Sequence, residues 1–74
     1  NNPRAQNYLG ALFFDGRGVT KDLQEAVKWF RHSSRQGNAQ ACQNLGICHQ
    51  AGLGLPKDLP KAEGLFRQAV AGGK

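Results

Sequence analysis

Few side chains in this 74-residue chain have the chemistry of a catalytic or metal-binding group. The candidate nucleophiles that follow a histidine are Ser33 and Ser34, and the only soft metal ligands are His32, Cys42, Cys48 and His49. A serine nucleophile needs a base and an orienting group within hydrogen-bond reach, and neighbouring residues of one helix cannot provide that geometry. The sequence also has no Gly-x-Ser-x-Gly, no Gly-rich loop that leads into Lys-Ser/Thr, and no His-Glu-x-x-His. We therefore expect that the protein is not an enzyme.

The two cysteines do not form a metal-binding pattern. Cys42 and Cys48 are separated by less than two helical turns, which places them about 240° apart around a helix. A structural zinc ion needs four converging ligands, often from Cys-x-x-Cys pairs, and the sequence contains no such pair. We expect no metal and no cofactor, and we expect both thiols to pack as small apolar side chains.

The overall composition is basic and moderately polar. Ten Lys and Arg residues against five Asp and Glu residues give a formal net charge of +5. The mean hydropathy is −0.56, and no run of about 20 apolar residues exists that could span a membrane. Neither a signal peptide nor a disulfide pair is visible, so the sequence favours a cytoplasmic location. Because the chain begins at Asn1 without a Met, we expect it to be a piece of a longer protein.

The elements that carry these residues repeat with a period of 36 residues. A shift by one period aligns identical residues without a gap: Leu9-Gly10 with Leu45-Gly46, Gly16 with Gly52, Gly18 with Gly54, Lys21-Asp22-Leu23 with Lys57-Asp58-Leu59, Ala26 with Ala62, Phe30-Arg31 with Phe66-Arg67, and Gly37 with Gly73. Such periodicity is typical of repeat architectures. We place repeat one at residues 1–37 and repeat two at residues 38–74.

Each repeat is predicted to form two antiparallel helices joined by a short Gly-x-Gly loop. Asn2 and Asn38 can cap the first helix of each pair, and Asp22 and Asp58 can cap the second. The predicted helices cover residues of about 3–15, 23–36, 39–51 and 59–71. Their apolar residues recur at helical spacing. The predicted buried faces are Ala5, Leu9, Leu12 and Phe13; Leu23, Ala26, Trp29, Phe30 and Ser33; Ala41, Cys42, Leu45 and Cys48; and Leu59, Ala62, Leu65, Phe66 and Ala69.

This pattern resembles the Sel-1-like repeat, a relative of the tetratricopeptide repeat. The resemblance is carried by Ala5, Leu9-Gly10, Phe13, Gly16, Gly18-Val19, Asp22, Ala26, Trp29, Ser33-Ser34 and Gly37. In the second repeat, His49, Leu55 and Leu65 replace the aromatic residue, the valine and the tryptophan. The 36-residue period and the Gly-x-Gly loop favour this family over the tetratricopeptide repeat of about 34 residues. The resemblance implies an all-α fold, an alpha-alpha superhelix (solenoid) of two helix pairs.

The pattern assigns packing roles to small and aromatic residues in both repeats. Gly10, Gly46, Ala26 and Ala62 let helix backbones approach, and a larger side chain there would cost about 1–3 kcal/mol. The residues expected to hold the repeats together are Leu9, Gly10, Gly16, Gly18, Asp22, Ala26, Trp29, Phe30, Gly37, Leu45, Gly46, Gly52, Gly54, Asp58, Ala62 and Phe66.

The resemblance also implies that the first helix of each pair lines a concave surface. With Leu9 taken as the buried direction, the residues expected on that surface are Arg4, Asn7, Tyr8, Ala11 and Phe14, followed by Gln40, Gln43, Asn44, Ile47 and Gln50. Carboxamides can donate to and accept from a peptide backbone, and Phe14 and Ile47 can anchor apolar side chains. We predict that this face binds a peptide or a partner domain. The alternative is that Phe14 packs under the following loop and Ile47 against a neighbouring helix.

A basic stripe offers a second surface. Lys28, Arg31 and Arg35 lie one helical turn apart, opposite the apolar side of their helix. Such a stripe could bind an acidic partner such as nucleic acid or an anionic membrane. The matching positions of repeat two are Gly64, Arg67 and Ala71, so the stripe does not continue along the array, and nucleic acid is not favoured.

The function that the sequence favours is a protein–protein interaction scaffold or adaptor. Two alternatives stay open, namely the basic face as the site for an acidic partner, and a purely structural spacer. Because at least three repeats are usually needed for a stable array, we expect further repeats beyond this sequence or self-association.

Overall fold

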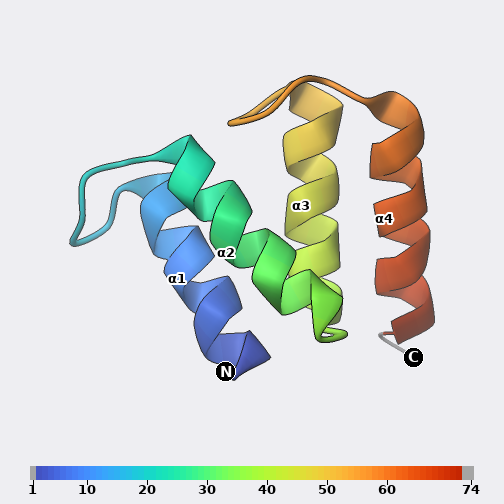
Figure 1. Ribbon diagram of the computed structural model, residues 1–74, viewed down its shortest axis with the longest axis horizontal. Helices are drawn as coiled ribbons and strands as arrows, with labels where there is room; N and C mark the ends of the chain where they lie inside the picture. Colours follow the sequence, from blue (N-terminus) through green and yellow to red (C-terminus); the bar gives the residue numbers. More distant parts are fainter. Residues whose placement is uncertain (1, 73–74) are drawn as a thin grey trace.

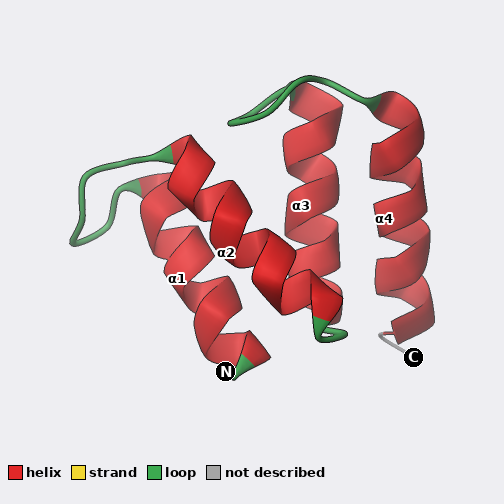
Figure 2. Ribbon diagram, in the orientation of Figure 1, coloured by secondary structure: helices red, strands yellow, loops and turns green. Residues whose placement is uncertain are grey.

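The computed structural model describes residues 2–72, which fold into four helices and contain no strand (Figure 2). The helices are α1 (Pro3–Asp15), α2 (Leu23–Arg35), α3 (Ala39–Ala51) and α4 (Leu59–Gly72). The all-α solenoid of two helix pairs predicted from the repeat is therefore the fold of the chain. Asn1, Gly73 and Lys74, at the ends of the two predicted repeats, lie outside the described residues.

The helices run alternately up and down, and each packs against its neighbours in the chain (Figure 1). The longer connections, between α1 and α2 and between α3 and α4, lie at one end of the molecule, and the short turn between α2 and α3 lies at the other. The Cα atoms span 32 × 27 × 14 Å. A depth of 14 Å corresponds to two layers of helices, since packed helix axes lie about 8–10 Å apart.

The same capping geometry occurs in both repeats. The Asn2 and Asn38 side chains accept hydrogen bonds from Arg4 N at 2.9 Å and Ala41 N at 2.8 Å. Asp22 accepts from Glu25 N and Asp58 from Lys61 N, both at 3.1 Å. These side chains satisfy amide groups that have no partner inside their helices.

The two Gly-x-Gly loops are closed by matching backbone bonds. Asp22 N donates to the Phe13 carbonyl at 2.9 Å, and Asp58 N donates to the His49 carbonyl at 2.8 Å. Gly16 and Gly52 end their helices with φ values of 71° and 70°, a left-handed conformation that glycine adopts without strain. Each loop therefore returns the chain against the helix that it has just left.

Within each repeat, a phenylalanine ring lies directly against a helical glycine. A Cβ atom added to Gly10 would lie 2.6 Å from the Phe30 ring, and one added to Gly46 would lie 2.8 Å from the Phe66 ring. Both distances are shorter than van der Waals contact, so only glycine allows the two helices to approach this closely. This contact agrees with the packing role predicted for these two glycines.

The core lies at the junction of the two repeats rather than inside either one. Its buried residues are Ala26, Val27, Phe30, Leu45 and Cys48. Three of them come from α2 and two from α3, so the second helix of repeat one and the first helix of repeat two share one core. At 0% and 2% exposure, Ala26 and Ala62 are both buried, as predicted.

Three residues predicted to be buried are exposed, and seven others, among them Trp29, are only half-buried. Leu9 is 37% exposed and Ala5 is exposed, whereas their repeat equivalents Leu45 and Ala41 are 4% and 0% exposed. Helix α2 packs against α3, and nothing within residues 2–72 covers α1 in the same way. Leu59 is 54% exposed at the start of α4, and Trp29 is only half-buried. The predicted stripe was wrong at these positions because the periodicity of a helix does not reveal whether a neighbour is present.

The glycine contact predicts opposite effects for one substitution at two sites. Gly10→Ala should lower the free energy of unfolding by about 1–3 kcal/mol, because the added methyl group would lie 2.6 Å from the buried Phe30 ring and force it to shift. Gly64→Ala, inside α4, should raise it by about 0.5–1 kcal/mol, since nothing lies within 4 Å of the added methyl group. Urea unfolding followed by circular dichroism measures both. Equal shifts in the two variants would show that the ring contact does not limit the packing.

Candidate functional site

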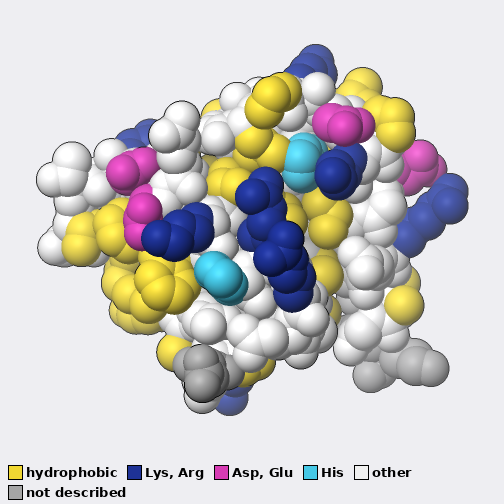
Figure 3. All heavy atoms as spheres, viewed as in Figure 1, with side chains coloured by type: hydrophobic (Ala, Val, Ile, Leu, Met, Phe, Trp, Pro, Cys, Tyr) yellow, Lys and Arg dark blue, Asp and Glu magenta, His cyan; other side chains and the backbone are white. Residues whose placement is uncertain are grey.

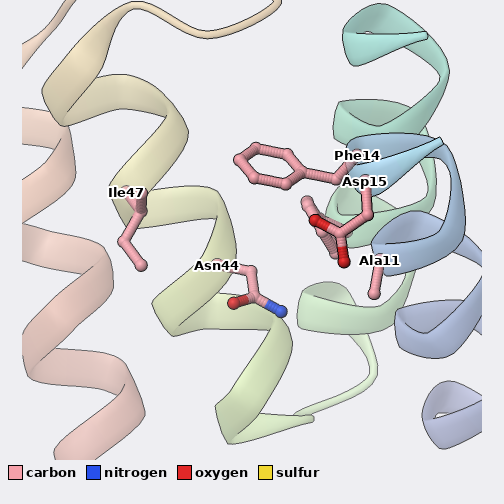
Figure 4. Close-up of a pocket in the computed structure, with 6 residues that line it drawn as sticks. Ala11, Phe14, Asp15, Asn44 and Ile47 are labelled. Carbon is pink, nitrogen blue, oxygen red and sulfur yellow. The ribbon is translucent and has the colours of Figure 1, made fainter. Parts of the chain in front are cut away.

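The first candidate site is a hollow of about 200 Å³ between α1 and α3, which we term the α1–α3 groove (Figure 4). Its lining residues are Ala11, Phe14, Asp15, Phe30, Asn44 and Ile47. Four of these residues were predicted to share a face, and the structure brings them together. Asp15 and Phe30 were not predicted to line it.

The floor of the α1–α3 groove is apolar. The rings of Phe14 and Phe30 pack with centroids 6.2 Å apart and planes tilted by 52°, a favourable aromatic arrangement. Ile47 remains 38% exposed across the groove. In addition to their packing contacts, Phe14 and Ile47 therefore both border the hollow.

The polar side of the groove presents hydrogen-bond acceptors. Asn44 Nδ2 donates to Asn7 Oδ1 at 3.0 Å and so links α3 to α1. This bond fixes the Asn44 amide and leaves its Oδ1 able to accept from another molecule. The Asp15 carboxylate also borders the hollow, and Arg17 Nε lies 3.7 Å from it in an exposed ion pair.

The other residues predicted for this face do not line the groove. Arg4, Tyr8, Gln40 and Gln50 are exposed elsewhere on α1 and α3. Gln43 borders a separate hollow with Phe66, Ala69 and Val70 of α4. The predicted face is therefore wider than the hollow.

The three cations of the basic stripe on α2 differ in their contacts. Lys28 Nζ lies 3.6 Å from Glu25 Oε2 and 6.0 Å from the centre of the Trp29 ring. Arg31 and Arg35 have no carboxylate within ion-pair distance among residues 2–72. They face a larger hollow, of about 400 Å³, which lies between α2 and α4 and which we term the α2–α4 groove.

The α2–α4 groove gathers charge from helices that are distant in sequence. Its lining residues are Arg31, Ser34 and Arg35 of α2, Leu45 and His49 of α3, and Lys61, Leu65 and Gln68 of α4. The space-filling view shows Lys and Arg side chains over α2 and over the start of α4, with histidine side chains beside them (Figure 3). Sequence reasoning missed Lys61 and His49. Lys61 could have been recognised from the sequence, because a cation in the first turn of a helix is unfavourably placed relative to the helix dipole.

His49 is buried beneath this groove with an unused ring nitrogen. The residue is 7% exposed, and no atom of residues 2–72 forms a hydrogen bond with its Nδ1. Burial lowers the pKa of His49, and the charges of Lys61 and Arg31 lower it further. The carboxylate of Asp58 and the backbone of Pro56 act in the opposite direction. The net effect favours the neutral imidazole.

Both cysteines are free and buried, as predicted. Burial raises the pKa of the Cys48 thiol to about 11 and also raises that of Cys42. The Cys42 Sγ atom lies 4.0 Å from the Ser34 carbonyl oxygen. Within the described range, no cluster of three or more His, Cys, Asp or Glu side chains is placed to hold a metal ion.

The length of the helices bears on membrane insertion. Each helix has 13 or 14 residues, whereas a membrane span needs about 20. No helix of residues 2–72 qualifies as a membrane span.

The sequence pattern of a known repeat matches the chain twice. The family described as "Sel1 repeat" matches residues 3–38 and again residues 39–74. The chain belongs to the Sel1 repeat family. Sel1 repeat proteins generally mediate protein–protein interactions, and the repeat is a non-catalytic scaffold.

Relatives of this Sel1 repeat chain include much longer proteins. It is 36% identical over 69 residues to the ERAD-associated E3 ubiquitin-protein ligase component HRD3A of Arabidopsis thaliana, covering 93% of this chain and 10% of that protein. It is also 36% identical over 69 residues to the DAP3-binding cell death enhancer 1 of Rattus norvegicus, covering 93% of this chain and 13% of that protein. The chain thus spans about a tenth of the length of these relatives.

A solved structure of the same family superposes closely. The crystal structure of a Sel1 repeat protein from Oxalobacter formigenes matches with a TM-score of 0.95 and 36% identity. The match covers 99% of this chain and 29% of the other. The two-repeat arrangement is therefore shared with part of a longer repeat protein.

The buried His49 predicts a stability that depends on pH. In the unfolded chain its pKa returns to about 6.5, so below that pH the unfolded state binds a proton more readily than the folded state. Stability should be full above pH 6.5 and should fall as the pH drops from there toward the lowered folded pKa. Thermal melting at pH 7.5 and 5.5 measures this loss of stability, and the loss should be smaller in His49→Gln. The exposed His32 provides the control, and an equal reduction in His32→Gln would contradict this assignment.

Proposed function

We propose that this Sel1 repeat chain binds a segment of a partner protein in the α1–α3 groove and performs no catalysis. The proposal rests on one observation above all. The groove joins an apolar lining to hydrogen-bond acceptors on two different helices, Asp15 of α1 and Asn44 of α3, and the Asn44 amide is held by its bond to Asn7. Binding sites commonly combine an apolar lining with a few well-placed polar groups.

The size of the groove limits what can enter it. A hollow of about 200 Å³ is smaller than the range typical of small-molecule sites, which begins at about 300 Å³. It suits a single apolar side chain of a longer segment. Phe14 and Ile47 would contact that side chain from α1 and α3, and the rest of the segment would lie along the exposed carboxamides of both helices.

The polar edge of the α1–α3 groove favours a partner that presents hydrogen-bond donors. Asp15 and the free Oδ1 of Asn44 both accept hydrogen bonds, and the Nδ2 of Asn44 is already engaged by Asn7. A partner segment would therefore place backbone N–H groups or a cationic side chain on this side of its apolar anchor. The residues that we assign to the site are Ala11, Phe14, Asp15, Asn44 and Ile47.

The names of two relatives agree with a role in assemblies. One is a component of a ubiquitin-protein ligase, and the other is named for binding DAP3. By analogy, this chain would act as an adaptor that presents a rigid surface to another protein. Which protein it contacts is a separate question from whether this groove is used.

A matched pair of variants tests the groove. Peptides selected from a random phage library on the wild-type chain would be synthesised and titrated by calorimetry. Ile47→Ala should weaken their binding about tenfold, as expected for a central apolar anchor. Leu59→Ala removes the same number of carbon atoms from an exposed position on α4 and should leave the affinity unchanged.

Nuclear magnetic resonance on the labelled chain locates the bound peptide independently. The largest amide shifts should fall on Ala11, Phe14, Asn44 and Ile47. Two results would contradict the proposal, namely equal loss of affinity in both variants, or shifts confined to α2 and α4. Failure to select any peptide would favour the role of a structural spacer.

A further inference from the structure

The α2–α4 groove is separate from the α1–α3 groove and has a different chemistry. Its rim carries three cations, Arg31, Arg35 and Lys61, and none of them has an ion-pair partner among residues 2–72. Three other cations, Arg17, Lys28 and Arg67, each lie within 4 Å of a carboxylate, whereas Arg4, Lys21 and Lys57 have no such partner among residues 2–72. The three groove cations differ from these in lining one hollow. Unpaired cations that converge on one hollow repel one another and leave the site ready for an anion.

The floor of the α2–α4 groove adds a second and independent observation. His49 is more than nine-tenths buried there, and its Nδ1 has no hydrogen-bond partner in the described range. A buried polar atom without a partner is costly and needs an explanation, and an ion or water bound beside it is one. Leu45 and Leu65 line the same floor and provide an apolar surface beside the charges.

We propose that the α2–α4 groove binds a phosphate monoester of the kind carried by a phosphorylated serine side chain. Such a group has a charge of about −1.5 to −2 at neutral pH and three strong acceptor oxygens. Arg31 and Arg35 supply planar guanidinium groups that match those oxygens in pairs, and Lys61 supplies a point charge from the opposite wall. Leu45 and Leu65 of the floor can contact the methylene group and the neighbouring backbone of the residue that bears the phosphate.

A single monoester fits the groove better than a nucleic acid strand does. A strand requires a charged surface that continues from one phosphate to the next. Repeat two has Gly64 and Ala71 at the positions of Lys28 and Arg35, and its Arg67 is paired with Glu63 at 2.9 Å. The cationic surface thus does not continue along repeat two. It comprises the hollow of about 400 Å³ and a smaller one of about 170 Å³ beside it, which Lys28, Arg31, His32 and Arg35 line.

The charged groups around His49 determine how its pKa responds to a bound anion. Arg31 faces it from α2 and Lys61 from α4, while Asp58 at the start of α4 is the nearby carboxylate. Asp58 is not among the residues that line the hollow, and its side chain caps α4 through Lys61 N. A bound dianion would offset the two cations and so favour the protonated imidazole of His49. Binding should therefore raise the pKa of His49.

The probe for the test is N-acetyl-phosphoserine amide, with the unphosphorylated compound as its control. Titration of the folded chain, followed by nuclear magnetic resonance, should give a millimolar dissociation constant and shifts at Ser34, His49 and Lys61. At saturation, the pKa of His49 should rise by a measurable amount. The unphosphorylated compound should cause neither effect.

The repeat supplies a matched control for charge. Arg31→Ala and Arg67→Ala change the same residue at equivalent repeat positions and remove the same charge, but only Arg31 faces the groove. Arg31→Ala and Lys61→Ala should each weaken binding about tenfold, whereas Arg67→Ala should have little effect. All three side chains are exposed, so the variants should keep the helix content of the wild type.

Several results would overturn the proposal. Equal weakening in Arg31→Ala and Arg67→Ala would mean that attraction by net charge alone is responsible. Tighter binding of a single-stranded oligonucleotide, with shifts at Lys28 and His32, would assign the face to nucleic acid. A probe concentration 20-fold above a millimolar dissociation constant should saturate the site. If the His49 signals do not shift at that concentration, or if the pKa of His49 is unchanged, the hollow does not hold the phosphate.

Discussion

The contact between a phenylalanine ring and a helical glycine determines how the helices of this protein are spaced. Phe30 rests on Gly10 and Phe66 rests on Gly46, each at a distance that a single additional carbon would prevent. The separation of the helices within each pair follows from this contact. Because α2 then packs against α3, the same spacing also sets the positions of the two grooves.

The two grooves differ because the alternating helices expose different residues. First helices carry carboxamides and isolated apolar side chains toward one groove, so that Asn44 and Asn7 can bond across it. Second helices carry cations toward the other groove. Each groove has a floor supplied by the helix between its walls, Phe30 of α2 in one case and Leu45 with His49 of α3 in the other. A scaffold of this kind can present two chemically distinct surfaces without any change in its backbone.

Most of the local structure could be predicted from the sequence because its causes are local. Asn and Asp caps, left-handed glycines and helical periodicity act over a few residues, and the 36-residue repeat showed each of them twice. The failures have one cause. Leu9 and Leu45 have the same residue type and the same place in the repeat, but Leu45 packs in the core with residues of α2, whereas Leu9 lies on a face of α1 that no helix of residues 2–72 covers. Burial therefore depended on the neighbouring helix rather than on the pattern.

The residues of the two candidate grooves also fall into two groups, those that follow from spacing along one helix and those that depend on a neighbouring helix. The sequence by itself determined the helix pairs, the repeat register, the glycine contacts and four residues of the α1–α3 groove, since these follow from spacing along one helix. Only the tertiary structure decided that Asp15 and Phe30 complete that groove, and that Lys61 and His49 join Arg31 and Arg35. Residues that lie far apart in sequence meet because two rings pack on two glycines, and the spacing of residues along one helix carries no information about that distance.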